Sequence, residues 1–249
     1  MTESEWVVGF HAVLAVLESD RPVEVLWLQD GRRDGRLAKI ETAARKRGLP
    51  LRRVPKRRLD EVALSRPHNG CGLRSSPVEL QTLDRLVRPD GEPARLVLLD
   101  AIDDPHNLGA VVRSAAAFGI DGVIIAGPSA PPLGGAAAKS AAGHLERVPM
   151  VRVNVAADAL RTLRDAGYWA LGAAMDGTPS RGIDPTHRWV LCMGSEHKGL
   201  RAKTKSAIDE FVAIPMAEGV ESLNLSVAAG VLMYELTRPS QEGEPGTQL

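Results

Sequence analysis

Polar side chains at three places in the chain stand directly after apolar runs, where they could do chemistry. At the first place, Asn107 follows the apolar run 95–100, and Arg113 comes six residues later among valines and alanines. Burying an unpaired guanidinium is costly, so an arginine in so apolar a helix needs a partner. Arg113 therefore either pairs with a carboxylate such as Asp103 or Asp104, or acts on a ligand.

The second place is a glycine-containing loop that presents a carboxylate. Gly194 and Gly199 have the spacing of the two glycines of a phosphate-binding P-loop. Leu200 and Arg201 stand where that motif requires Lys and Ser or Thr, so the chemistry of a nucleoside triphosphatase is missing. No GxGxxG follows a predicted strand either, which weakens a nicotinamide or flavin enzyme. What remains is a tight turn that holds Glu196 close to accessible backbone amides.

The third place joins a short apolar segment to a helix. Residues 214–216 read Ile-Pro-Met, and residues 222–226 read Ser-Leu-Asn-Leu-Ser before an apolar helix that runs through Tyr234. Ser222 is the predicted N-cap, which puts Asn224 in the first helical turn, where a polar side chain has access to a ligand. One helix face is predicted to pack into the core or against another subunit, and it consists of Leu223, Val227, Val231 and Tyr234.

Alternating strands and helices must position these segments. The strands are predicted at 95–100, 122–126, 151–153, 168–173 and 189–193, and helices at 108–118, 136–142 and 156–166, with a surface loop at 127–135. This order is typical of a mostly parallel sheet that is covered on both faces. Ligands bind at the carboxyl ends of such strands, where the first two segments lie.

The N-terminal part shows the same rhythm on a smaller scale and is strongly basic. Helices are predicted at 9–17 and 36–48, strands at 25–28 and 51–54, then a short helix through Leu64 and a turn at 68–73 that leads into a last strand. Residues 32–58 hold twelve basic and two acidic residues, a net charge of +10 in a chain whose total is zero. This density can neutralise phosphates of a nucleic acid, although a solvated helix face explains it as well.

Composition and the chain ends exclude several classes. No apolar run is long enough to span a bilayer, and the first residues carry acidic rather than basic charge, so we expect a soluble, cytoplasmic protein without a signal peptide. Cys71 and Cys192 are far apart, which indicates reduced thiols rather than a disulfide or a zinc site. The polar segment 84–94 contains two prolines and a glycine and is typical of a connector between domains.

Together, the three segments resemble motifs 1, 2 and 3 of the SpoU (TrmH-type) RNA methyltransferases. These motifs are an Asn with a following Arg, a GxExxG loop, and Ile-Pro-Met followed by Ser-Leu-Asn and Ser. The match covers about residues 95–238. The sequence DPHNLGAVVRSA at the first motif and the opening GFHAV are similar to the bacterial RlmB type of this family, which methylates a guanosine ribose in the peptidyl-transferase centre of 23S rRNA.

The resemblance implies an architecture. Residues 95–240 would form a SPOUT α/β domain with a mostly parallel sheet, a C-terminal trefoil knot and an obligate homodimer through the knot region. Residues 1–78 would form a small L30e-like α/β domain that binds RNA. Composition and position, rather than the resemblance, predict a linker at residues 79–94 and a disordered tail at residues 241–249. Periodicity alone favours an unknotted doubly wound sheet, because knots are rare.

The resemblance also implies a cofactor and a site. The cofactor would be S-adenosylmethionine, without a metal, and its adenosine would lie among largely apolar residues, namely Gly194, Ile214, Leu223, Met193, Met216 and Ser222. The catalytic set would be Arg113, Glu196, Asn224 and Asn107. A ribose hydroxyl is a poor nucleophile, and arginine practically never deprotonates, so Arg113 is expected to grip the adjacent phosphate and stabilise the developing alkoxide. Glu196 and Asn224 would orient Arg113 or the ribose. A role for Glu196 as the base that removes the hydroxyl proton is the less favoured alternative.

Two departures from the family pattern bear on the substrate. His197 and Lys198 stand where small or acidic residues are commoner, and Asn69 precedes Gly70 where the RlmB type usually has Gln. The small domain reads RNA, so the second departure leaves the RNA site open. The alternatives are a tRNA methyltransferase, a resistance methylase acting on another rRNA loop, and a non-catalytic RNA-binding or ribosome-assembly protein with the same fold.

Overall fold

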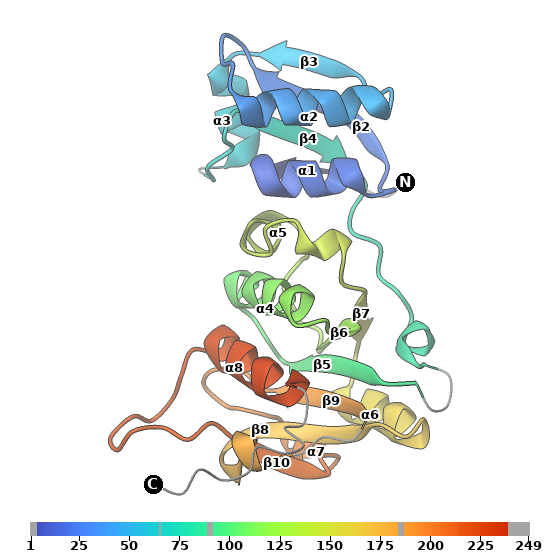
Figure 1. The fold of residues 1–249 in the computed structure, drawn as a ribbon, viewed down its shortest axis with the longest axis vertical. Coiled ribbons are helices and arrows are strands. Elements are labelled where there is room, and N and C mark those ends of the chain that lie inside the picture. Colours follow the sequence, from blue (N-terminus) through green and yellow to red (C-terminus); the bar gives the residue numbers. More distant parts are fainter. Residues whose placement is uncertain (1–3, 65, 89–91, 184–186, 239–249) are drawn as a thin grey trace, which may run out of the picture.

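The computed structural model describes residues 4–64, 66–88, 92–183 and 187–238, which build two β-sheets one above the other (Figure 1). The smaller sheet has the order β1-β4-β2-β3, with β2 and β3 parallel and β4 antiparallel to both its neighbours. Its strands are β1 (Glu5–Val8), β2 (Val23–Gln29), β3 (Leu51–Val54) and β4 (Cys71–Ser75), and its helices are α1 (Phe10–Glu18), α2 (Gly35–Lys46) and α3 (Lys56–Ala63).

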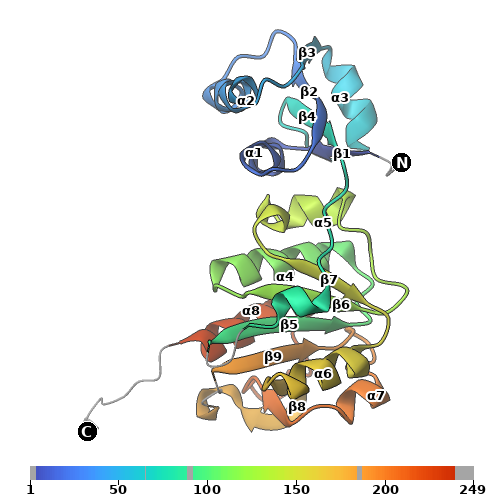
Figure 2. The same ribbon diagram turned by 90° about the vertical axis from the view of Figure 1, so that its right-hand side faces the viewer.

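The helices of this small unit lie on both faces of its sheet. Figure 2 shows α1 and α2 on one side and α3 on the other. Fully buried side chains such as Leu26, Leu28 and Ile40 form the core between the sheet and α1 and α2. Helix α2 begins after Asp34, whose carboxylate accepts a hydrogen bond from Leu37 N; this bond and the Arg32 guanidinium hold the pKa of that carboxyl below its usual value. The predicted elements of this part are present, and the structure adds the edge strand β1, which no pattern indicated.

The larger sheet has six strands, and every pairing in its described part is parallel. Its order is β10-β8-β9-β5-β6-β7. The strands are β5 (Ala94–Asp100), β6 (Gly122–Ala126), β7 (Met150–Val153), β8 (Trp169–Pro179), β9 (Arg188–Met193) and β10 (Glu210–Ala213). The helices are α4 (Pro105–Ala117), α5 (Gly135–Ser140), α6 (Ala156–Asp165), α7 (Ala202–Lys205) and α8 (Leu225–Thr237).

Two hydrophobic cores cover the two faces of this sheet. One core joins the sheet to α4, α5 and α8, and the other joins it to α6 and to the loop and helix after β9. The predicted parallel α/β sheet covered on both faces is therefore confirmed. Strand β10 was not foreseen, because its four residues follow no long apolar run. The trefoil knot stays a prediction.

Helix α8 differs from its predicted form in its cap and in its buried face. Asn224, not Ser222, is the N-cap, since the Asn224 side chain accepts hydrogen bonds from Ser226 N and Val227 N. The predicted face is the exposed one: Leu223, Val227, Val231 and Tyr234 are 36–52% exposed. The core instead receives Leu225, Ala229, Leu232, Met233 and Leu236. The prediction that this face packs into the core is therefore wrong. The alternative prediction, that it packs against a second subunit, remains.

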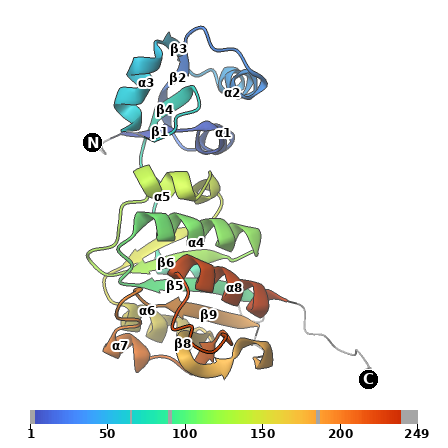
Figure 3. The same cartoon turned by 90° about the vertical axis from the view of Figure 1, so that its left-hand side faces the viewer.

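The small unit contacts the large one through α1 and the 3-10 helix η2 (His144–Glu146). Arg21 is 9% exposed, donates to Glu146 over 2.8 Å and also pairs with Glu5 of β1. Gly143 lies so close to α1 that a Cβ there would be 2.6 Å from that of Ala15. Helices α1 and α5 face each other across this contact (Figures 1 and 3).

The segment predicted as a linker, residues 79–94, is partly packed. Gln81 N donates to Met150 O over 2.8 Å beside β7, and the 3-10 helix η1 (Leu83–Leu86) buries Leu86 against Gly122. The predicted domain boundaries stay a prediction, and the tail 241–249 lies outside the described residues. No helix in the described part of the chain is long and apolar enough to cross a membrane.

Candidate active site

Three side chains from distant parts of the chain form one hydrogen-bonded group, which we call the Asn–Glu–Asn cluster: Asn107, Glu196 and Asn224. Asn107 Nδ2 and Asn224 Nδ2 donate to the same oxygen, Glu196 Oε1, over 2.9 and 2.8 Å. Asn224 Nδ2 also lies 3.0 Å from Asn107 Oδ1, and Leu225 N donates to Glu196 Oε1 over 3.4 Å. The carboxylate therefore ties the first turns of α4 and α8 to the loop after β9.

Local sequence explains how α4 presents Asn107. Asp104 is the N-cap of α4 and accepts a hydrogen bond from His106 N over 2.8 Å, and Pro105 occupies the first helical position, which suits a residue without an N–H. Asn107 then falls in the first turn, 5% exposed, with its amide directed at Glu196. Only a short loop, residues 101–104, separates the helix from the end of β5, so Asn107 lies at the carboxyl edge of the sheet.

The loop that holds Glu196 is closed by its two glycines. Ser195 and Gly199 exchange both backbone hydrogen bonds, at 3.1 and 2.9 Å. A Cβ on Gly194 would lie 2.0 Å from the carbonyl carbon of Gly199, and Gly199 itself has a φ of +63°. The GxExxG spacing is thus required for this turn, which confirms the tight turn expected from the sequence.

An ion pair between a buried carboxylate and an exposed arginine, which sequence reasoning missed, fixes the same loop to β5. Asp100 is fully buried at the end of β5 and accepts from Arg201 Nε over 2.7 Å and from Arg201 N over 2.9 Å. These two residues are 101 positions apart, and no local pattern connects them. The pair holds the first and second motifs side by side.

Arg113 lies apart from the Asn–Glu–Asn cluster, on the exposed side of α4. It lines an open hollow with Phe118, and with Val227 and Tyr234 of α8. Neither Asp103 nor Asp104 pairs with it, and no ion pair of Arg113 occurs within the described ranges. The explanation that Arg113 pairs with a carboxylate therefore does not hold for the described residues, and its guanidinium faces solvent.

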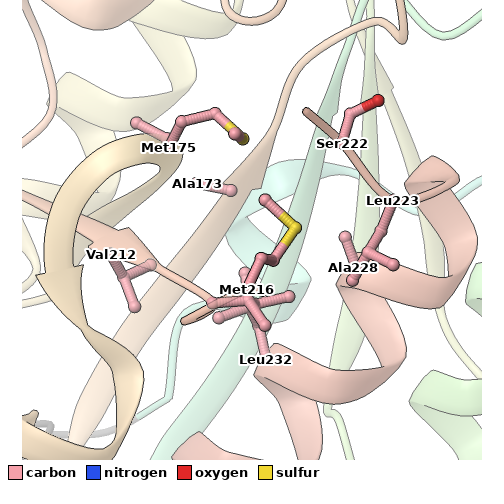
Figure 4. A pocket seen from close by; sticks show the side chains of 10 residues that line it. Ala173, Met175, Val212, Met216, Ser222, Leu223, Ala228 and Leu232 are labelled. Atoms are coloured by element: carbon pink, nitrogen blue, oxygen red, sulfur yellow. The ribbon is translucent and has the colours of Figure 1, made fainter. Parts of the chain in front are cut away.

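An apolar pocket lies on the other side of α8 (Figure 4). Of the six residues predicted to bind the cofactor, four line it: Ile214, Met216, Ser222 and Leu223. Met193 is buried in the core at the end of β9, and Gly194 packs against the backbone of its own loop, so neither lines this pocket.

The remaining lining residues were missed by sequence reasoning. They come from the middle of β8, from β10 and from α8, and they are Ala173, Ala174, Met175, Val212, Ala228 and Leu232. The run of small residues after the apolar part of β8 is a weak signal that the backbone there must leave space. In Figure 4, Met175 lies at the upper left and Met216 in the middle of the view, between Val212 and Ala228. Thioether side chains adapt readily to a flat ring.

The two cysteines take no part in this site. Both are buried, and burial raises the pKa of the Cys71 thiol to about 12 and that of Cys192 well above its usual range. Thiols with such pKa values are inert as nucleophiles. In the part of the chain that the structure describes, no group of three or more His, Cys, Asp or Glu side chains could hold a metal ion.

Comparison with known proteins accounts for this arrangement. The model of the SpoU rRNA methylase family matches residues 94–234, and a second model, RNA 2′-O ribose methyltransferase substrate binding, matches residues 6–81. The chain belongs to the SpoU rRNA methylase family.

Curated relatives of this family cover nearly the whole chain. The 23S rRNA (guanosine-2′-O-)-methyltransferase RlmB of Xanthomonas axonopodis pv. citri is 36% identical, over 95% of this chain and 97% of its own length. A relative from Staphylococcus haemolyticus, named only as a TrmH family tRNA/rRNA methyltransferase, is 35% identical over 93% of this chain and 94% of its own.

Solved structures share the fold. The SpoU methyltransferase AviRb of Streptomyces viridochromogenes, in complex with AdoMet, has a TM-score of 0.81 and 25% identity and covers 97% of this chain and 92% of that one. A second structure comes from work on the 2-OH methylation of C/U34 on tRNA. The match includes 95% of that chain but only 59% of this one, with a TM-score of 0.53 and 25% identity.

Proposed function

We propose that this protein transfers the methyl group of S-adenosylmethionine to the ribose 2′-OH of a guanosine in 23S rRNA. The observation that carries the proposal is the Asn–Glu–Asn cluster, built from the three motifs and held at the carboxyl edge of the sheet beside the apolar pocket. The relatives named RlmB support the choice of substrate, since they match over both parts of the chain. The family resemblance points to the peptidyl-transferase centre.

The apolar pocket fits an adenosine. Its side chains are apolar except for Ser222, and three of them are the long, flexible or branched residues Ile214, Met216 and Leu223. Such a lining suits a flat heteroaromatic ring, whose polar edge is then left to backbone groups. When bound, S-adenosylmethionine supplies the electrophilic methyl group. Gly194 and Met193 would act indirectly, by shaping the loop and the strand end beneath the pocket.

The hydrogen bonds of Glu196 favour an orienting role over that of a base. Its Oε1 accepts from two side-chain amides and one backbone N–H, so this oxygen already serves to position the starts of the two helices. Glu196 and the two asparagines are thus assigned to fixing the position of α4 and α8 around the ribose.

Arg113 is assigned to the phosphate next to the target ribose. Its guanidinium has no partner among the described residues and lies in an open hollow, so it can grip an incoming phosphate in a bidentate manner and stabilise the developing alkoxide. The proton of the 2′-OH then leaves to solvent or to a phosphate oxygen, because arginine does not deprotonate.

The exposed apolar face of α8 supports a homodimer. Val227, Val231 and Tyr234 lie side by side with Phe118, whose ring centroid is 5.8 Å from that of Tyr234. A second copy seated on this face would bury it, and would enclose the hollow of Arg113. Sedimentation would test this: Val231→Glu should give monomers, whereas the same change at exposed Val155 on the far face should not. A monomeric wild-type protein would contradict it.

Ribose-methylation mapping tests the function. The protein is incubated with S-adenosylmethionine and with 23S rRNA or total tRNA from cells that lack it. One new 2′-O-methylguanosine in 23S rRNA is expected. New ribose methylation in tRNA alone would contradict the rRNA assignment. It would support the alternative of a tRNA methyltransferase, which the name of the Staphylococcus haemolyticus relative includes. A folded protein that does not bind S-adenosylhomocysteine would overturn the enzyme assignment.

A further inference from the structure

A polar cleft on the small unit, on the side of α3, has no role in the site described above. Its volume is about 550 Å³, within the range of small-molecule sites. It is lined by Gln29, Arg32, Lys56, Asp60, Arg66 and Asn69. We propose that this cleft binds a backbone phosphate of the substrate RNA, between Arg32, Lys56 and Arg66. The inference deepens the proposed function and rests on it for the identity of the RNA.

The cations of the cleft keep donors free for an anion. Arg32 uses Nε for Asp34, at 2.8 Å, and Arg66 uses Nε and Nη2 for the carbonyls that end α3, at 2.7 and 3.2 Å. Within the described ranges, no bond engages the Nη atoms of Arg32 or Nη1 of Arg66. Lys56 Nζ lies 3.9 Å from Asp60, which is a loose contact. Three cations thus line the cleft beside Asp60, and the N–H groups on these atoms of Arg32 and Arg66 are unused.

The single carboxylate of the cleft is already engaged. Gly70 N donates to His68 Nδ1 over 3.0 Å, so the ring proton of His68 must be on Nε2. That nitrogen lies 3.0 Å from Asp60 Oδ1 and donates to it. One oxygen of Asp60 is bound by His68 and the other faces Lys56, so Asp60 holds the cleft together. With Asp34, the partner of Arg32, also counted, the three cations leave a net positive charge of one for the ligand.

The turn at the base of the cleft is rigid. The His68 side chain is 8% exposed, and Cys71 N donates to His68 O over 3.0 Å. Gly70 has a φ of +80°, and a Cβ there would lie 2.9 Å from Arg32 Cδ. The bare glycine therefore lets the Arg32 side chain lie across the turn. A cleft that is formed before the ligand arrives loses less entropy on binding.

The cleft also lies on a route to the active site. Arg66 Nη1 is 3.8 Å from the position that a Cβ would take on Gly135, the first residue of α5. At the other end of α5, Ser140 Oγ lies 3.1 Å from His106 Nδ1, next to Asn107. Helix α5 has six residues and so spans about 9 Å. Figure 3 shows α3 above the loop that enters α5, on one side of the molecule. A short run of nucleotides could connect the two sites over exposed Lys139.

The salt dependence of RNA binding tests the proposal. The full-length protein binds a transcribed 23S rRNA fragment at several salt concentrations, and the slope of log Kobs against log[salt] is compared between variants. The double variant Arg32→Ala/Lys56→Ala should reduce that slope by at least about 0.7, the value for one lost phosphate contact on a single strand. The KM for RNA should rise several-fold while kcat stays unchanged. Lys56→Arg, which keeps the charge, should retain the wild-type slope.

Arg57→Ala/Arg58→Ala is the matched control, because it also removes two charges, from α3 residues that are 90% and 66% exposed and lie outside the cleft. It should leave the slope and KM close to the wild-type values. Equal effects of the two double variants would overturn the cleft in favour of a diffuse charge effect, and an unchanged slope in Arg32→Ala/Lys56→Ala would overturn it outright. RNA binding by a wild-type protein that methylates nothing would refute the proposed function but leave this test valid.

Discussion

Asn107 Nδ2 lies 2.9 Å from Glu196 Oε1, although 89 residues separate the two in the chain. This bond and its counterpart from Asn224 mean that one carboxylate oxygen organises the starts of two helices. The site is therefore sensitive to the acceptor at position 196 rather than to its charge alone, and the first prediction follows from this.

Glu196→Ala should lower the free energy of unfolding by about 1–3 kcal/mol, because three donors lose their acceptor while water replaces part of the loss at this exposed loop. Glu196→Gln retains a carbonyl oxygen and should recover most of that stability. Urea unfolding of both variants measures the difference. If the two variants were equally stable, the cluster would not hold the helices as described.

Arg113→Ala should reduce methyl transfer by at least about 10²-fold, the scale of losing one charged group that stabilises a developing oxyanion. Its side chain is exposed and unpaired within the described ranges, so stability should change by no more than about 0.5 kcal/mol. Binding of S-adenosylhomocysteine, measured by calorimetry, should be unchanged. Arg113→Lys keeps the charge without the bidentate fork and should recover only part of the activity. An active alanine variant would refute the role.

Ala228→Leu should fill the apolar pocket from α8. The Kd for S-adenosylhomocysteine should rise at least about tenfold, which corresponds to a loss of about 1.4 kcal/mol of binding free energy. Ala217→Leu makes the same change in the neighbouring loop, outside the pocket, and serves as the control. Calorimetry on both variants decides, and equal affinities would place the cofactor elsewhere.

Glu146→Ala should destabilise the protein by about 3 kcal/mol, because it removes one partner of the buried Arg21 guanidinium. The side chains of Arg21 and Glu146 are only 6% and 11% exposed, so water screens the pair little. Glu235→Ala breaks the surface pair with Arg238 and should cost less than about 1 kcal/mol. Urea unfolding compares the two, and similar losses would mean that the contact between the two units contributes nothing.

Alkaline pH should destabilise the fold through its thiols. Burial raises the pKa of Cys71 from about 9 to about 12. The unfolded chain therefore releases this proton above pH 9 while the folded chain keeps it, so stability is fully present below pH 9 and is lost as pH rises toward 12, by about 1.4 kcal/mol per pH unit. Cys71→Ala should remove that share of the slope between pH 9 and 11. The free energy of unfolding is measured by urea titration at each pH. If its dependence on pH were the same in Cys71→Ala and in the wild type, the thiol would ionise as freely in the folded chain as in the unfolded one.

The parallel sheet could be predicted because its central strands are continuous apolar runs, and β6 and β3 have the predicted bounds. The strands β1 and β10 were not predicted, because each consists of a glutamate and only three apolar residues, and so short an apolar run does not indicate a strand. The buried face of α8 was misassigned because almost all its residues are apolar, so spacing alone cannot choose a face. Ser222 and Asn224 are equally good caps by type, and only the fold selects Asn224.

For the site, the motif residues came from the sequence and their contacts from the structure. The GxExxG loop closes as its glycines require. The pairing of Asp100 with Arg201 and the contribution of Ala173–Met175 to the pocket depend on strand order, which places β9 between β5 and β8. Local patterns contain no information on that order.

The order of the motifs along the chain has a consequence during synthesis. The small sheet is complete once residue 75 has left the ribosome, whereas the cluster around Glu196 needs Asn224 and the helix behind it. Domains fold in the order in which they emerge. A nascent chain therefore carries the basic cleft of its small unit long before it has a methyl-transfer site, and the enzyme becomes competent only in the last moments of translation.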